Sequence, residues 1–115
     1  MAEVRLRRIE SLIREEICSM IFQGEIKDPR VERLTTVTEV NVSRDLGHAK
    51  VWVSRFGDRA AVAQSVQALN HAAGFIQTVL SKRMSLRIFP HLTFLLDDSM
   101  ENGFRIAKKL RDVMH

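Results

Sequence analysis

The sequence predicts an α+β fold in which three strands and three helices follow the order α-β-β-α-β-α. Apolar residues recur every three or four positions in two long stretches, which is typical of amphipathic helices. A short stretch rich in Val and Thr and a second stretch with alternating small apolar residues flank turn-forming residues, which is typical of a β-hairpin. A chain of 115 residues with 45% hydrophobic residues can bury one core. We therefore expect residues 1–115 to form a single domain, a three-stranded sheet with helices on one face.

The first helix is predicted over residues 4–22. Its apolar stripe consists of Ile9, Leu12, Ile13, Ile17, Met20 and Ile21. Gly24 follows where a left-handed residue commonly ends a helix, and Pro29 prevents further helix because proline lacks an N–H.

Residues 34–42 and 48–56 are predicted to be the two strands of the hairpin, joined by the turn formers of residues 43–47. In the first strand the even-numbered positions from Leu34 to Val42 form the less polar face. In the second strand Ala49, Val51 and Val53 share a face.

The second helix is expected to begin after Asp58, a good N-cap residue, and to run for about six turns. Its apolar positions from Val62 to Met84 are three or four residues apart. Gly74 lies inside this stretch, although a glycine within a helix costs about 1 kcal/mol relative to alanine. We therefore expect Gly74 to have a specific purpose.

The third strand is predicted over residues 91–96, because Pro90 confines it to the far side of the proline or to an edge. Asp98 or Ser99 is expected to cap a last helix, in which Glu101 completes a capping box. The last turns of that helix carry four basic residues, namely Arg105, Lys108, Lys109 and Arg111.

Few residues suggest chemistry, and no cofactor or metal is expected. Cys18 is the only cysteine, so no intrachain disulfide forms, and a small buried hydrophobe is its simplest interpretation. Asp97 and Asp98 could bind a metal, but carboxylates in front of a helix are usually caps. No signal-like start and no long apolar stretch are found, so we expect a cytoplasmic protein without a membrane segment.

The distribution of charge suggests a nucleic-acid partner. The chain has a net charge of +4, and residues 59–96 contain four basic residues and no acidic one. Basic clusters occur at Arg5, Arg7 and Arg8 and at Lys82, Arg83 and Arg87. Long cationic side chains suit phosphate oxygens, although a solvated helix face explains many charge runs. Trp52 and Phe75 are either core residues or platforms on which bases stack.

Five segments together resemble bacterial ribosome-binding factor A. They are residues 25–30, 40–46, 49–53, 72–76 and 86–94, and the similarity covers nearly the whole chain. The resemblance implies a type II KH-like fold, in which the usual Gly-x-x-Gly loop between two helices is replaced by an Ala-x-Gly kink. Ala72 and Gly74 match that kink, where glycine lets the helix bend and brings backbone close to a sugar-phosphate strand.

The same resemblance implies a non-catalytic, late-stage assembly factor of the small ribosomal subunit. Such a factor binds the subunit and its rRNA, assists maturation of the rRNA 5′ end and contributes to cold adaptation. The RNA-binding residues expected here are Arg5, Arg7, Arg8, Ala72, Gly74, Lys82, Arg83 and Arg87. Gln77 stands where the family pattern predicts an arginine. We expect a monomer, with assembly GTPases as candidate further partners.

Two other function classes are compatible with a small basic domain. One is a protein-interaction module whose sheet face and basic patch bind an acidic protein partner. The other is a small hydrolase, which is disfavoured because no nucleophile, base and oxyanion donor are recognisable in the sequence.

Overall fold

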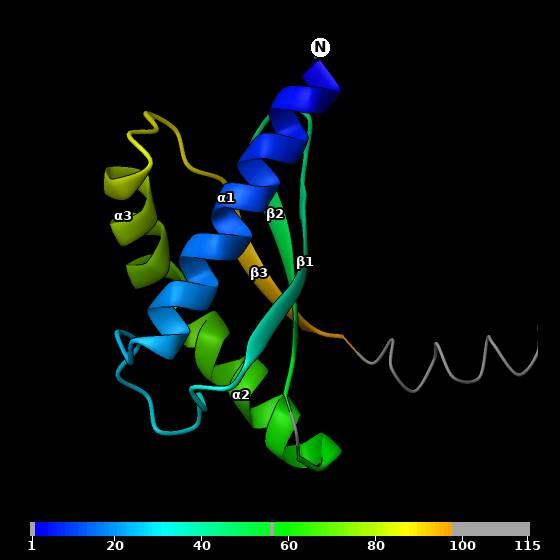
Figure 1. The fold of residues 1–115 in the computed structure, drawn as a ribbon, viewed down its shortest axis with the longest axis vertical. Coiled ribbons are helices and arrows are strands. Elements are labelled where there is room, and N and C mark those ends of the chain that lie inside the picture. The colour runs from blue at the N-terminus through cyan, green and yellow to red at the C-terminus, as the bar shows by residue number, and fades with distance from the viewer. Residues whose placement is uncertain (1, 56, 98–115) are drawn as a thin grey trace, which may run out of the picture.

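The computed structural model describes residues 2–55 and 57–97, and Figure 1 shows their arrangement. The elements are α1 (Ala2–Phe22), β1 (Thr36–Val42), β2 (His48–Ser54), α2 (Arg59–His71), α3 (Ala73–Arg83) and β3 (His91–Leu96). The predicted α+β class and the order of elements up to the third strand are confirmed. The long second helix is broken into α2 and α3, as the kink implies. The predicted last helix lies outside the described residues.

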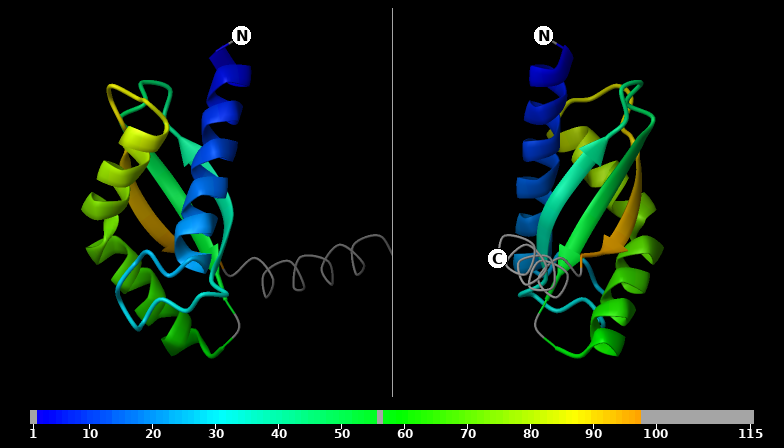
Figure 2. Two further views of the ribbon diagram at one scale, coloured as in Figure 1. Left: turned by 60° about the vertical axis from the view of Figure 1, so that its left-hand side comes forward. Right: turned by 90° about the vertical axis from the view of Figure 1, so that its right-hand side faces the viewer.

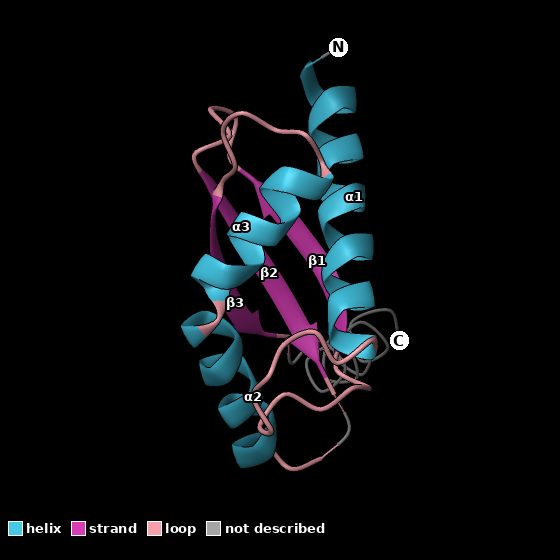
Figure 3. Cartoon of the chain, turned by 90° about the vertical axis from the view of Figure 1, so that its left-hand side faces the viewer, coloured by secondary structure: helices cyan, strands magenta, loops and turns pink. Residues whose placement is uncertain are grey.

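The sheet has the strand order β1-β2-β3, with β1 antiparallel and β3 parallel to β2. Neighbouring parallel strands require a crossover connection, and α2 with α3 supplies it. All three described helices lie on one face of the sheet, which leaves the other face without a described helix (Figures 2 and 3). This pattern agrees with the type II KH-like architecture.

The alternation in β1 differs from the prediction, because a β-bulge shifts the register between Val37 and Glu39. Val37, Val40 and Val42 are buried, whereas Leu34, predicted to begin the strand, lies in a turn before β1 and is 62% exposed. The bulge adds one residue to β1, so the even-numbered positions are the buried ones only after Thr38. The Thr38 hydroxyl donates to the carboxylate of Asp97, which secures the bulge to the end of β3.

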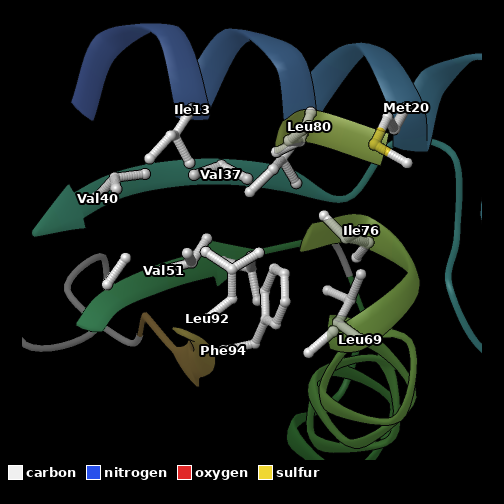
Figure 4. Packing of buried hydrophobic residues seen from close by; sticks show 14 of the residues in the cluster. Ile13, Met20, Val37, Val40, Val51, Leu69, Ile76, Leu80, Leu92 and Phe94 are labelled. Carbon is white, nitrogen blue, oxygen red and sulfur yellow. The ribbon is translucent and has the colours of Figure 1, made fainter. Parts of the chain in front are cut away.

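The core lies between the sheet and the helices (Figure 4). Its fully buried large side chains include Ile13, Ile17, Met20, Ile21, Leu69, Ile76, Leu80, Leu92 and Phe94. Burying each such side chain stabilises the fold by roughly 1.5–3 kcal/mol. The predicted stripe of α1 is confirmed except for Leu12, which is 42% exposed because it lies at the margin of the stripe.

The connection between α1 and β1 is anchored at several points. Gly24 adopts a φ of +70°, as predicted for the residue that ends α1. The Asp28 carboxylate accepts hydrogen bonds from the backbone N–H and the guanidinium of Arg30 at 2.8–3.1 Å. These bonds lower the pKa of Asp28 to about 2. The buried Ser65 hydroxyl on α2 donates to the Arg30 carbonyl at 2.6 Å, so this connection is fixed against α2.

Side-chain amides from both crossover helices bind the outer edge of β3. The Phe94 N–H donates to Asn70 Oδ1 at 2.7 Å, and Asn70 Nδ2 donates to the Phe94 carbonyl at 3.0 Å. The Leu92 N–H donates to Gln77 Oε1 at 3.0 Å. Backbone groups on this edge, which have no strand neighbour in the described sheet, therefore pair with α2 and α3.

We predict that Asn70→Ala lowers the free energy of unfolding by about 1–3 kcal/mol, because two partly buried backbone groups of β3 lose their partner. Urea denaturation measures this change. Gln67→Ala, an exposed site on the same helix, serves as the control and should change stability by less than about 0.5 kcal/mol. Equal effects of the two substitutions would mean that the amide contributes nothing to the attachment of β3.

Candidate nucleic-acid interface

The break between α2 and α3 is centred on Ala72. The Ala72 N–H donates to the carbonyls of Ala68 and Leu69 at 3.0 and 3.1 Å, which completes α2. The Ile76 N–H donates to the Ala72 carbonyl at 3.0 Å, which begins α3. Asp58 caps α2 as predicted, through a 2.7 Å hydrogen bond from the Ala61 N–H. No side chain caps the N-terminus of α3.

Gly74 is exposed and lies in the first turn of α3, two residues after the break. A Cβ built on Gly74 meets no atom within 4 Å, and its φ is not in the left-handed range. The bend therefore occurs at Ala72 and does not depend on the conformational freedom of Gly74. The fold therefore has room for a side chain at position 74, and no contact among the described residues requires glycine there.

Phe75 extends the exposed surface at the break. Its side chain is 53% exposed, whereas the next residue, Ile76, is fully buried. Of the two aromatic residues considered as stacking platforms, Phe75 is therefore outside the core. Trp52 on β2 is only partly exposed.

Gln77, which stands where the family pattern predicts an arginine, has a structural role. Its side-chain oxygen is bonded to the Leu92 N–H, so it faces β3. Together with Asn70 it flanks the break on both sides. The role of Asn70 was not predicted from the sequence. The only signal for it is that a polar residue directly follows Leu69, a member of the apolar stripe.

The basic residues of the predicted site come from three regions. Arg5, Arg7 and Arg8 are exposed on the first turns of α1, at the end of this helix that carries the label N in Figure 3. Lys82 is exposed on the last turn of α3, about 12 Å along the helix from Gly74. Arg87 is exposed in the connection to β3. Only Lys82 and Arg83 share an element with Gly74.

Arg83 is engaged within the protein. Its guanidinium donates to both carboxylate oxygens of Glu25 at 2.6 and 3.2 Å and lies 3.7 Å from the carboxylate of Glu16. The hydrogen bonds from Arg83 lower the pKa of Glu25, and those to Glu25 raise the pKa of Arg83. Arg83 thus connects α3 to α1 and to the residues that follow α1.

The described residues bring no three His, Cys, Asp or Glu side chains together at a spacing suited to a metal ion. Asp97 is bonded to Thr38, and Asp98 lies outside the described residues. Cys18 is partly buried on α1. Between residues 2 and 97, no helix combines the length and hydropathy of a membrane span.

Comparison with known proteins identifies the same family as the resemblance in the sequence. Residues 5–110 match the sequence model of the family described as ribosome-binding factor A. A ribosome-binding factor A from Treponema denticola is 45% identical over 113 residues, covering 98% of this chain and 86% of the relative.

Two structures of similar proteins share the fold. A Thermotoga maritima protein, described as a putative ribosome binding factor A, superposes with a TM-score of 0.69 at 30% identity, covering 79% of this chain and 85% of that one. A Thermus thermophilus ribosome binding factor A, a homology model fitted into the cryo-EM map of a 30S complex, gives 0.60 at 27% identity, covering 76% and 90%.

Proposed function

The chain belongs to the ribosome-binding factor A family, and we propose that it binds the rRNA of the small ribosomal subunit through the break between α2 and α3. The observation that carries this proposal is the exposed, unobstructed backbone of Gly74 at the uncapped start of α3. Backbone N–H groups at a helix N-terminus favour anions, and RNA presents a phosphate at every nucleotide. The 30S complex of the Thermus thermophilus relative supports the choice of subunit.

The basic side chains supply the part of the affinity that does not depend on RNA sequence. Lys82 and Arg87 lie on or just after α3, and Arg5, Arg7 and Arg8 extend the charge along α1. Each phosphate neutralised releases condensed counterions, so binding weakens as salt increases. Arg83 contributes to this set through its charge, while its hydrogen bonds remain directed to Glu25.

We propose further that the protein acts as a binding factor without chemistry of its own. It holds an rRNA conformation during late assembly in the cytoplasm, as a monomer and without a cofactor. Maturation of the 5′ end is then carried out by separate nucleases that act on the shape it stabilises. Assembly GTPases are candidate partners in its release.

The contribution of the basic residues can be measured by the salt dependence of binding. We expect Lys82→Ala with Arg87→Ala to reduce the slope of log K against log salt by about 1.4–1.8, because two phosphate contacts are lost. Binding to purified small subunits is measured by sedimentation at several salt concentrations.

The control for this pair is Arg14→Ala with Lys50→Ala, which removes the same charge from exposed sites on α1 and on β2. Circular dichroism verifies the fold of each variant. If both pairs reduce the slope equally, the interaction depends on total charge and the proposed placement is wrong.

Gly74→Ala should separate stability from binding. Alanine is a better helix former and finds open space at this position, so the free energy of unfolding should rise by about 0.5–1 kcal/mol. Binding to the small subunit should become roughly tenfold weaker, which corresponds to about 1.4 kcal/mol, because the methyl group keeps RNA away from the backbone. Gln64→Ala, an exposed site on α2, is the control. If Gly74→Ala binds the small subunit like the wild type, the backbone at position 74 does not belong to the interface.

A further inference from the structure

A hollow of about 330 Å³ lies beside the helix break, on the side of the connection between α1 and β1. Figures 1 and 3 show this connection running next to α2. The hollow is lined by Glu25, Ile26, Lys27, Asp28, Ala68, His71, Ala72 and Phe75. Its volume is at the lower end of the range for small-ligand sites, which is about 300–1,000 Å³.

The walls of the hollow combine an apolar floor with an exposed aromatic ring. Ile26 and Ala68 are buried, and Ala72 is partly buried. Phe75 also lines the hollow, and it is 53% exposed. A flat, solvated aromatic ring next to an apolar surface is the arrangement on which single-stranded bases stack.

The polar groups of the hollow are held in place before any ligand arrives. Asp28 is fixed by Arg30 and Glu25 by Arg83, and both carboxyls have lowered pKa values because of these hydrogen bonds. They are therefore ionised at neutral pH and only accept hydrogen bonds. Lys27 and His71 are exposed and add donors at the rim. The carboxylate acceptors match the amino and ring N–H groups of a base, and the donors at the rim match a phosphate next to that base.

We propose that this hollow, which we call the base pocket, binds one unpaired RNA base stacked on Phe75. The proposal rests on the proposed function, because the RNA strand that passes over Gly74 is the one that delivers the base. It adds a recognition element, since phosphate contacts alone position RNA and do not distinguish its unpaired nucleotides. The alternative is that the hollow binds a side chain of a protein partner, and the tests below distinguish the two.

The first test titrates the full-length protein with adenosine 5′-monophosphate and, as the control, with ribose 5-phosphate, which lacks the base. Amide NMR signals of Ile26, Ala72 and Phe75 should shift with the nucleotide and not with the sugar phosphate. Equal shifts with both compounds would show a phosphate site only and would overturn the proposal. No shift at these amides with either compound would also overturn it.

The second test compares Phe75→Ala with Phe22→Ala, since Phe22 is another exposed phenylalanine, at the end of α1. Loss of one stacked base corresponds to a decrease of roughly 5- to 150-fold in affinity for purified small subunits. Phe75→Ala should show this decrease, Phe75→Tyr should restore binding, and Phe22→Ala should bind like the wild type.

The outcomes separate this proposal from the one on which it rests. If Phe75→Ala binds subunits normally while Gly74→Ala does not, the base pocket is wrong and the interface at the helix break stands. If the wild type does not bind small subunits at all, both proposals fail. If Phe75→Ala loses subunit binding but the wild type shows no nucleotide-dependent shifts, the hollow serves a protein side chain and the proposal is again overturned.

Discussion

The attachment of β3 to the two crossover helices is the constraint on which the rest of the structure depends. β3 has one strand neighbour in the described sheet, and the amides of Asn70 and Gln77 bind its other edge. One amide lies before the break at Ala72 and the other after it. The relative orientation of α2 and α3 is therefore set by their common partner. In the first turn of α3, Ala73 and Ile76 face the core, and the opposite side of that turn faces outward. The exposure of Gly74 and Phe75 follows from this arrangement.

The connection between α1 and β1 is held by a second group of interactions. Arg83 on α3 binds Glu25, Ser65 on α2 binds the Arg30 carbonyl, and Arg55 binds Glu32 at 2.7 Å. The two ion pairs among them add little stability one by one, because they lie at the surface. The combined effect of the three interactions is positional, since they keep residues 25–32 against α2, α3 and the end of β2 and so shape one wall of the base pocket. A wall that is ordered in advance reduces the entropy lost on binding.

The outline of the fold could be predicted from the sequence because it depends on local signals. The stripe of α1, the hairpin, the Asp58 cap and the strand after Pro90 all follow from periodicity or from a single residue's chemistry. The burial of Val37 could not be predicted, because a bulge at Thr38 changes which face a residue occupies, and the predicted strand began too early, since Leu34 lies in a turn before β1. The roles of Asn70, Gln77 and Arg83 depend on partners 15 to 58 residues away, and no local pattern reveals such pairs. The base pocket was missed for the same reason, since its walls come from separate elements.

Photo-crosslinking of the protein to the small subunit tests the central claim, that RNA contacts the helix break, most directly. Benzoylphenylalanine is placed at position 75, beside the break, or at position 50 on the sheet face that carries no described helix. The account predicts crosslinks to rRNA from position 75 and none from position 50. Crosslinks to rRNA from position 50 alone would contradict the account, because the sheet face would then be the surface that meets RNA.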